Sequence, residues 1–503
     1  WDEPVEWQAN TPEGEYAPID FYGGTLRGIA DRLHYLQKLG VTVLYLNPIF
    51  ESASNHRYDT GDYRKVDPIL GTNTDFKKLC AAAADCGIRI VLDGVFAHTG
   101  ADSRYFNRFR HYPGCGAYNS RSSIYARWYS FAHYPDDYKC WWDFKDLPAI
   151  NAANPDWRKY MITGERSIVR TWLRDGASGW RLDVADELPD DVLRDMRAAA
   201  KAADPDSVLL GEVWEDAVTK VSYGERRQYA LGDALDSVMN YPLRDALVAF
   251  LTGRSTARTL ADLLLSQRLN YPQPLYYALM NLTASHDVAR TRSALALDFD
   301  PRSRTRAELA ALEITDAMAA RGAQLQVLAA AVQFWLPGIP SIYYGDEAGM
   351  QGLCDPFNRA PLQMCDTQML QWYAQLTTLR HTHPALTRGE VAVFAPAGDV
   401  LCILRVIAGG RDAFGEEAED EALLLIVNRA AHPVHCHAEL TCPGAGLCEE
   451  TRLAFVRSEY DCAASCFDDT HIVLHDGVGA FDLPPHAAKI YRLENRHGTE
   501  TGS

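Results

Sequence analysis

Basic residues are in the minority in this chain, which has 49 Lys and Arg against 67 Asp and Glu and a formal net charge of -18. A surplus of negative charge repels phosphate backbones and anionic lipid surfaces. The sequence also has no apolar run near the roughly 20 residues that a membrane-spanning helix needs. We therefore expect neither nucleic acid nor a membrane as a partner.

A secretory signal peptide is not visible either, because no basic segment followed by an apolar one opens the chain. This favours a cytoplasmic location. Trp1 need not be the natural start of the protein, so an earlier signal segment stays open.

Zinc-binding spacings are missing among the 12 cysteines. Cys80 and Cys86 fall in a helix-like segment, where small buried side chains are the simplest interpretation. Five more gather late in the chain and leave disulfides there open: Cys436, Cys442, Cys448, Cys462 and Cys466.

What the sequence does contain is a repeated unit of helix, glycine stop and apolar strand. Residues 25–39 have apolar side chains at helical spacing, end at Gly40 and lead into a strand at 41–47. The unit returns with a helix from 74 to Gly87 and a strand at 88–93. A third copy starts with Asn154 as N-cap and Pro155 at the first helical position, has a helix to residue 174, and ends in a strand at 179–183.

Further apolar strands are predicted at 208–212, 234–240, 279–285 and 339–345. Apolar strands between helices indicate a parallel sheet covered on both faces. Each strand ends in polar residues, as the strands of a (β/α)8 TIM barrel do at the end that carries the chemistry: Asn47, Asp93, Asp183, Glu212, Asn240, His286 with Asp287, and Tyr344. A doubly wound open sheet is the alternative, which seven strand units suit less well than a ring of eight.

The chain of 503 residues is long enough for a large domain and a smaller one. We predict a catalytic barrel at 1–388, with an irregular subdomain inserted at about 99–151 that overhangs the site. Short alternating apolar segments after Gly389 predict a C-terminal antiparallel β-sandwich at 389–503.

Three carboxylates stand at these strand ends. A retaining glycosidase needs two carboxyl groups about 5 to 5.5 Å apart, one as nucleophile and the other as general acid and base. Asp183 and Glu212 end adjacent predicted strands. Asp287, after the predicted strand at 279–285, supplies a third carboxylate. Arg181 lies two residues before Asp183 on the same strand face, where its guanidinium can keep the nucleophile ionised.

Four ordered segments resemble the motifs of the α-amylase family of glycoside hydrolases: Asp93 to His98, Gly179 to Asp183, Gly211 to Trp214 and Ser285 to Asp287. Three others are similar to its neopullulanase, cyclomaltodextrinase and amylopullulanase branch: Pro48 to Thr60, Asp236 to Pro242 and Tyr343 to Glu347. Several motifs in order over hundreds of residues carry more weight than any one alone.

The resemblance implies a role for each matching residue. Asp183 would be the nucleophile, Glu212 the acid/base, and Asp287 the residue that grips sugar hydroxyls. The implied substrate-binding residues are Tyr58, stacking on the sugar at the cleavage position, His98 and His286, donating to its hydroxyls, Arg181, Trp214 as an apolar wall beside Glu212, and the pair Asp355 and Arg359 for the next sugar. Taken singly, Arg181 or either histidine would more often be structural, and Trp141 with Trp142 could equally pack the subdomain or form a glucan platform.

Two positions depart from the family pattern. Many members have an asparagine before the histidine of the first motif as a calcium ligand, whereas this chain has Ala97, which cannot coordinate a hard cation. We predict no required cofactor and no metal-ligating residue, with calcium as the alternative. Ala149 stands where the neopullulanase pattern has lysine, which leaves the preferred bond open.

The predicted function is retaining hydrolysis of α-1,4 and also α-1,6 glucosidic bonds in maltodextrins, cyclodextrins or pullulan. The alternatives are a transglycosylase or an α-1,6-glucosidase on the same scaffold, or a non-catalytic glucan-binding homologue, which the presence of all three carboxylates disfavours. An α-glucan oligosaccharide or polysaccharide is the expected partner, and a homodimer stays open.

Residues 1–20 are rich in proline and polar side chains and contain no strand pattern, although the first barrel strand should precede the helix at 25–39. Seven strands are predicted where closure needs eight. We therefore expect this chain to be a fragment of a longer protein, cut after its first strand.

Overall fold

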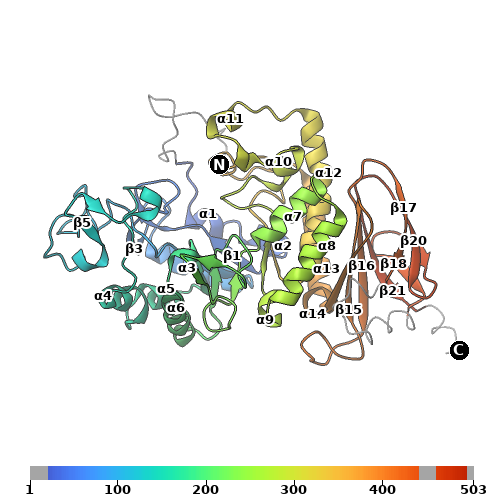
Figure 1. The fold of residues 1–503 in the computed structure, drawn as a ribbon, viewed down its shortest axis with the longest axis horizontal. Helices are drawn as coiled ribbons and strands as arrows, with labels where there is room; N and C mark the ends of the chain where they lie inside the picture. The colour runs from blue at the N-terminus through green and yellow to red at the C-terminus, as the bar shows by residue number, and fades with distance from the viewer. Residues whose placement is uncertain (1–20, 441–459, 496–503) are drawn as a thin grey trace. The chain divides into compact units, whose positions relative to one another are not determined.

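The structure is a computed structural model that describes residues 21–440 and 460–495. The chain forms two compact units, Trp1–Met239 and Asn240–Ser503 (Figure 1). Residues 1–20, and with them the predicted absence of a first strand, lie outside the described residues. The predicted domain limits at 388 and 389 stay a prediction.

The first unit contains a parallel sheet of five strands in chain order. The strands are β1 (Val43–Leu46), β4 (Arg89–Gly94), β7 (Gly179–Leu182), β8 (Val208–Gly211) and β11 (Ser237–Val238). A doubly wound sheet reverses its strand order at a switch point, and this sheet does not. Each strand instead pairs with the next one along the chain, as in a (β/α)8 barrel. All carboxyl ends therefore meet at one edge.

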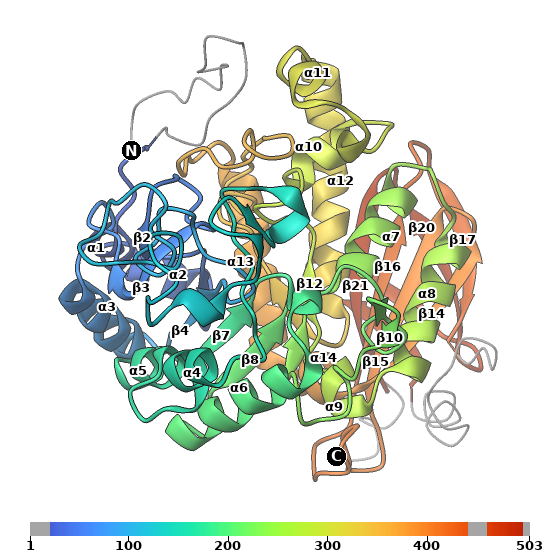
Figure 2. The same cartoon turned by 60° about the vertical axis from the view of Figure 1, so that its left-hand side comes forward.

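Helices cover the outer side of this sheet, where Figure 2 shows α3, α5 and α6. The predicted helix at 25–39 is wrong as one element, because it divides into α1 (Leu26–Ala30) and α2 (Leu33–Lys38). The bond from the Arg32 amide to the Ile29 carbonyl tightens the chain there and interrupts the helical ladder. The predicted glycine stop is confirmed, since Gly40 has φ of 85°.

The second helical segment agrees better with its prediction than the third. In α3 (Asn73–Asp85), Thr72 and Asp75 form a capping box, and Gly87 follows with φ of 72°. In the third segment the Asn154 cap is confirmed, but the single helix to residue 174 is wrong. After α4 (Pro155–Arg158) and the π-helical turn η3 (Lys159–Thr163), the chain extends at Gly164, and Ser167 caps α5 (Ile168–Arg174) anew.

The inserted segment at 99–151 is irregular, as predicted, and packs around aromatic rings. Phe106 contacts Tyr129 and Tyr138 with ring centroids 4.9 and 4.7 Å apart. Isolated bridges tie the segment to the first motif, including His98 to Ala149. The smaller elements of this unit are β2 (Phe50–Ser52), β3 (Thr60–Val66), η1 (Ala126–Trp128), β5 (Phe131–His133), β6 (Asp137–Tyr138), η2 (Trp141–Asp143), η4 (Ala185–Glu187), α6 (Asp190–Ala203), β9 (Val221–Ser222) and β10 (Glu225–Arg226).

The second unit begins with helices around one parallel strand pair, β12 (Met280–Leu282) with β13 (Ile339–Ser341). Its helices are α7 (Tyr241–Leu251), α8 (Ala257–Asn270), α9 (Gln273–Tyr276), α10 (Thr291–Ala296), η5 (Pro301–Ser303), α11 (Arg306–Ala310), α12 (Asp316–Trp335), α13 (Thr367–Thr382) and α14 (Pro384–Arg388). The described residues thus contain one parallel sheet of five strands in the first unit and one parallel pair in the second.

The C-terminal part has two antiparallel sheets that share one core, which confirms the predicted sandwich. The larger sheet has the order β14 (Glu390–Ala397), β15 (Val400–Ile407), β16 (Glu421–Asn428), β21 (Ala487–Glu494), β18 (Cys462–Ser465) and β19 (His471–Val473). The smaller pairs β17 (Val434–Glu439) with β20 (Val478–Leu483).

Alternate residues of β15 serve two cores. Val400, Cys402 and Leu404 face the core that the two sheets share, whereas the side chain of Arg405, on the opposite side, donates from Nη1 to the Trp335 carbonyl of α12 at 2.6 Å. The helices of this unit and the sheet are therefore packed together (Figure 1).

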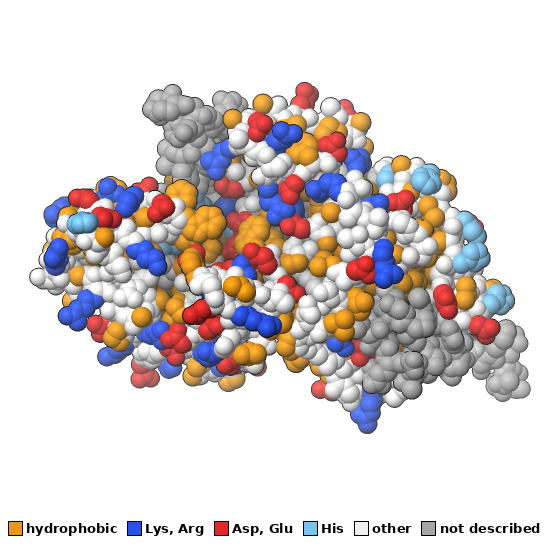
Figure 3. Space-filling view, in the orientation of Figure 1, with side chains coloured by type: hydrophobic (Ala, Val, Ile, Leu, Met, Phe, Trp, Pro, Cys, Tyr) orange, Lys and Arg blue, Asp and Glu red, His pale blue; other side chains and the backbone are white. Residues whose placement is uncertain are grey.

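The cysteines of the C-terminal part that the structure describes, Cys436, Cys462 and Cys466, are free thiols. None of the helices among residues 21–440 and 460–495 combines the length and apolar character that a bilayer-spanning segment needs. On the visible face, charged side chains of both signs are interspersed, and histidines gather over β17 and β20 (Figure 3).

Candidate active site

Arg181 is the centre of the candidate active site in the first unit. It projects from β7, its side chain is fully buried, and its Nη1 donates to both carboxylate oxygens of Asp93 and to Oδ1 of Asp183, each at 2.9 Å. Its Nη2 forms an ion pair of 2.8 Å with Oε2 of Glu212. One guanidinium thus contacts three carboxyl groups from the ends of three neighbouring strands, β4, β7 and β8.

The electrostatics of this cluster leave negative charge in excess. Burial opposes the charge on Arg181, yet Asp93 and Glu212 raise the pKa of its guanidinium well above the usual value. Burial raises the pKa of the Asp93 carboxyl, against the opposing effects of Arg181 and of the Tyr45 and Tyr58 hydroxyls. One cation therefore faces three buried carboxyl groups, and Asp93 is the one whose neutral form burial favours.

Asp93 is a member of this cluster that the predicted site omits. It accepts hydrogen bonds from the hydroxyls of Tyr45 at 2.6 Å and Tyr58 at 2.9 Å. The available signal was its position one residue before the end of β4, which resembles that of Asp183 directly after β7. Tyr45 lies on β1, whose own sequence indicates only a buried strand.

Glu212 is oriented by two donors besides Arg181. Its Oε2 accepts the backbone amide of Val184 at 2.8 Å, and its Oε1 accepts Nε1 of Trp214 at 2.9 Å. The Val184 bond depends on an unusual backbone, with φ of 37° and ψ of 62°. A β-branched residue pays a steric cost in this left-handed region, so the surrounding structure must hold it there.

Tyr58 contacts the Asp93 carboxylate, and His98 in turn contacts Tyr58. His98 Nε2 lies 3.0 Å from the Tyr58 carbonyl, so Nε2 carries the hydrogen and Nδ1 is left as an acceptor. Nδ1 has no hydrogen-bond partner among the described residues. Burial lowers the pKa of His98 to about 4, which keeps the ring neutral. The tautomer therefore suits accepting a sugar hydroxyl through Nδ1, while the predicted donation to sugar stays a prediction.

An aromatic stack begins at His98. The ring of Trp141 lies 5.6 Å from that of His98, and Trp142 stacks on Trp141 at 5.1 Å and 15°. Phe144 also stacks on Trp141 at 5.9 Å. Trp142 is 72% exposed. The stack thus runs from a buried imidazole to an open indole face.

The remaining predicted residues lie in the second unit. His286 Nε2 and the Tyr241 hydroxyl both lie 3.2 Å from Asp287 Oδ2. Arg359 Nε pairs with Asp355 Oδ1 at 2.6 Å. The structure therefore brings together His286 with Asp287, and Asp355 with Arg359.

Asn358 also belongs to this group, and the sequence prediction missed it. Its Nδ2 donates to the carbonyls of Ser285, His286 and Val288 at 3.0, 3.0 and 2.8 Å. These bonds fix the loop that presents Asp287. Between 70 and 73 residues separate the partners, so no local pattern could reveal the contact.

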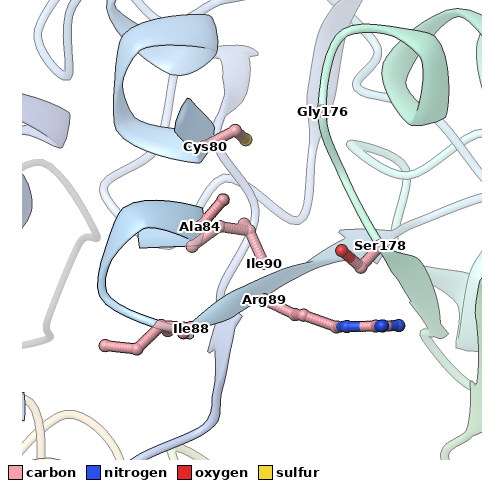
Figure 4. A pocket seen from close by; sticks show the side chains of 8 residues that line it. Cys80, Ala84, Ile88, Arg89, Ile90, Gly176 and Ser178 are labelled. Atoms are coloured by element: carbon pink, nitrogen blue, oxygen red, sulfur yellow. The ribbon is translucent and has the colours of Figure 1, made fainter. Parts of the chain in front are cut away.

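A pocket of the first unit lies at the other end of the sheet (Figure 4). Its lining includes Cys80 of α3, Arg89 and Ile90 at the start of β4, and Gly176. Barrel enzymes use the carboxyl ends of their strands, so this pocket is not the candidate site.

A resident metal ion would need several ligating side chains in one place. Among residues 21–440 and 460–495, no group of three or more His, Cys, Asp or Glu side chains is arranged to hold a metal ion. Ala97 offers only a methyl group, and its carbonyl accepts the amide of Ile150. That the protein requires no cofactor stays a prediction.

Known structures define the class of protein. The cyclic α-maltosyl-(1→6)-maltose hydrolase from Arthrobacter globiformis, solved in complex with cyclic α-maltosyl-(1→6)-maltose, matches with a TM-score of 0.73 and 27% identity over 97% of this chain and 92% of that chain. An α-amylase from Geobacillus thermoleovorans shares the fold, with a TM-score of 0.73 and 22% identity over 97% and 96% of the two chains. The chain therefore shares with these proteins a (β/α)8-barrel fold with a C-terminal antiparallel β domain.

Sequence comparison names the family. Residues 6–370 match the α-amylase catalytic domain, and the chain belongs to the α-amylase family. It is 38% identical over 443 residues to an amylopullulanase from Thermoanaerobacterium saccharolyticum, covering 82% of this chain and 33% of the relative. It is 31% identical to a cyclomaltodextrinase from Bacillus sp, covering 85% and 71%. The chain spans a third or less of the length of the amylopullulanases that it matches.

Proposed function

We propose that this protein hydrolyses α-glucosidic bonds of glucans with retention of configuration. One observation carries the proposal: Arg181 contacts both Asp183 and Glu212, which follow the paired strands β7 and β8. Two carboxyl groups held by one guanidinium are close enough to flank a single glycosidic bond. Both are buried, with 7% and 5% of their surface exposed.

The two carboxyl groups would act in turn. Asp183 attacks the anomeric carbon while Glu212 donates its proton to the leaving oxygen, so the glycosidic bond breaks and a covalent glucosyl ester forms. Water then attacks the same carbon, gives a proton to Glu212 and releases Asp183. The Arg181 bond keeps Asp183 ionised for its attack, and the Trp214 and Val184 bonds aim Glu212.

Sugar recognition is proposed for the residues around the pair. Tyr58 would stack on the ring at the cleavage position, with its hydroxyl fixed on Asp93. His98 would accept a hydroxyl hydrogen through Nδ1. Trp142, exposed at the end of its stack, would support a neighbouring sugar.

Two further pairs of residues are proposed to bind sugar, as the family resemblance implies. Asp287 and His286 would bind hydroxyls of the sugar at the cleavage position, and Asp355 with Arg359 would hold the next sugar. The side chains are already paired in a way that suits these roles, because each carboxylate is held by a cation or a hydroxyl.

The substrate class follows from the relatives. Amylopullulanase, cyclomaltodextrinase and neopullulanase are the names that similar proteins carry, and one structural relative hydrolyses a cyclic (1→6)-linked maltosyl maltose. We propose α-1,4 and also α-1,6 bonds of maltodextrins, cyclodextrins or pullulan as substrates. The covalent ester also allows transfer to a sugar acceptor in place of water.

Product analysis tests both the chemistry and the substrate. Proton NMR of the first products from maltotriose should show α-anomers, and chromatography should show cleavage of pullulan or β-cyclodextrin. Initial release of β-anomers would contradict the assigned pair of carboxylates. No cleavage of any of the three glucans by the folded protein would contradict the proposed function.

A further inference from the structure

The loop that follows the proposed acid/base contains a small hairpin of β9 and β10; Figure 2 carries the label β10. Ser222 pairs with Glu225, so the turn consists of Tyr223 and Gly224 alone, with φ of 52° and 80°. Two successive left-handed residues define a type I′ turn, which favours Asn-Gly or Asp-Gly. A tyrosine at the first position carries a steric cost at positive φ, so hairpin formation alone does not explain why Tyr223 stands there.

The side chain of Tyr223 is exposed and yet fixed. The residue is 75% exposed, while its hydroxyl donates a 2.6 Å hydrogen bond to Oε1 of Glu187. Partial burial and the bond to Glu187 raise the pKa of Tyr223 to about 12, so the hydroxyl stays protonated and keeps donating. An open aromatic face is thus held in one orientation, at low entropic cost to any ligand that stacks on it.

The base of the hairpin is fastened to the segment after the proposed nucleophile. Lys220 Nζ lies 2.8 Å from Asp186 Oδ2, and the Tyr229 hydroxyl donates to Asp186 Oδ1 at 2.5 Å. Arg227 donates through Nε to Asp190 Oδ1 at 2.9 Å. These bonds join the loop after Glu212 to the loop after Asp183. The hairpin is therefore placed firmly at the carboxyl ends of β7 and β8.

The side of the scissile bond follows from the chemistry. A general acid must stand next to the leaving oxygen that it protonates, so Glu212 faces the leaving-group part of the substrate. Trp214 and the hairpin continue from Glu212 in the same loop, and Trp214 contacts the acid directly. The loop after Glu212 thus borders the leaving-group side.

We propose that Tyr223 is a stacking platform for an outer glucose unit of the α-glucan on the leaving-group side of the cleaved bond. This specificity-determining role rests on the proposed function. A glucose ring has an apolar face that packs well on an aromatic plane, and the Glu187 bond leaves the Tyr223 ring face open. A structural role would be served better by asparagine, which suits the turn and exposes no ring.

The test compares a long and a short substrate. Tyr223→Asn should lower the ratio of kcat/KM for maltoheptaose to that for maltotriose about two- to tenfold, the range of an aromatic stacking contact. The same variant should melt at the same or a higher temperature, because Asn-Gly is the favoured turn pair. Tyr223→Trp should keep the ratio. A folded Tyr223→Asn protein with the wild-type ratio would overturn the proposal.

A matched control is available in Tyr118. It is another tyrosine whose hydroxyl donates to a carboxylate, Asp136 Oδ1 at 2.5 Å, and Tyr118→Asn should not change the ratio. Calorimetric titration of maltoheptaose into Glu212→Gln protein, with and without Tyr223→Asn, separates binding from catalysis. Should the wild type cleave no α-glucan, the proposed function fails, and this titration still decides whether Tyr223 binds the chain.

Discussion

The backbone amide of Val184 donates to the proposed acid/base, Glu212, only because Val184 adopts a left-handed conformation. The residue after the nucleophile thereby positions the second carboxyl group. Asp183 and Glu212 are joined through this amide as well as through Arg181.

Because the backbone at Val184 is strained, we expect a glycine variant there to be more stable than an alanine variant, the reverse of the usual order. Glycine adopts positive φ without steric cost, whereas alanine keeps that cost and loses two methyl groups. Val184→Ala should therefore be less stable than Val184→Gly, by about 1 kcal/mol. Urea unfolding of the two variants measures the difference. An alanine variant more stable than the glycine variant would show that the backbone there is not strained.

Substitution of either proposed catalytic residue should abolish turnover while the fold survives. Asp183→Asn and Glu212→Gln keep the shape of each side chain but remove its charge or its proton transfer. Acid/base catalysis alone contributes about 10²–10⁴-fold, so we expect at least a hundredfold loss of kcat on maltotriose. Circular dichroism checks folding. Near wild-type rates in either folded variant would refute the roles assigned here.

Arg181→Met should destabilise the protein by about 3 to 5 kcal/mol, since it leaves three buried carboxyl groups without their cation. The loss should shrink as the pH falls towards 4. The pKa of Asp93 is already raised by burial and would rise further, so the folded variant binds more protons than the unfolded chain and loses stability as the pH rises. Arg181→Lys, which keeps one charge, should lie between. A loss independent of pH would contradict this account.

The buried His98 gives a second pH dependence of stability, with the opposite sign. Its pKa is about 4 in the folded protein and 6.5 ordinarily, so the unfolded state takes up the proton first as the pH falls. Stability from His98 should be complete above pH 6.5 and lost between 6.5 and 4, by about 3 kcal/mol. His98→Gln should flatten the measured free energy of unfolding over this window. An equally steep profile in the variant would mean that other groups cause it.

Chelation should leave the protein unchanged, because Ala97 replaces the expected oxygen ligand. Activity on maltotriose and the melting temperature are measured before and after dialysis against EDTA. A large loss that calcium alone restores would reveal a cation site.

The sequence predicts well those features that short patterns determine. Gly40 and Gly87 end their helices as expected, and Asp183 and Glu212 follow paired strands. The helix breaks were not visible. Gly164 interrupts a segment that its other residues would continue, and the capping Ser167 reads as an ordinary helix residue until the break is known.

Contacts between distant segments are the part that sequence patterns do not determine. Arg181 and Asp93 are 88 residues apart, and Asn358 reaches carbonyls 70 to 73 residues away. The pairing of Arg181 with Asp183 was predictable because the two residues are two positions apart at the end of one strand. Its contact with Glu212 depends on the register of β7 with β8, which only the fold supplies.

The sequential strand order also affects how this scaffold can change. Asp93, Asp183 and Glu212 all contact one guanidinium, that of Arg181. The loops that follow these residues, in contrast, start from separate strand ends. A change in the length of such a loop, for example at 99–151 or 213–236, would therefore leave the strand positions of the carboxylates unchanged. The proposed bond-cleaving residues are thus fixed by the strands, while the surrounding loops are free to vary. Loop insertion can therefore change which glucan is preferred without changing the proposed chemistry.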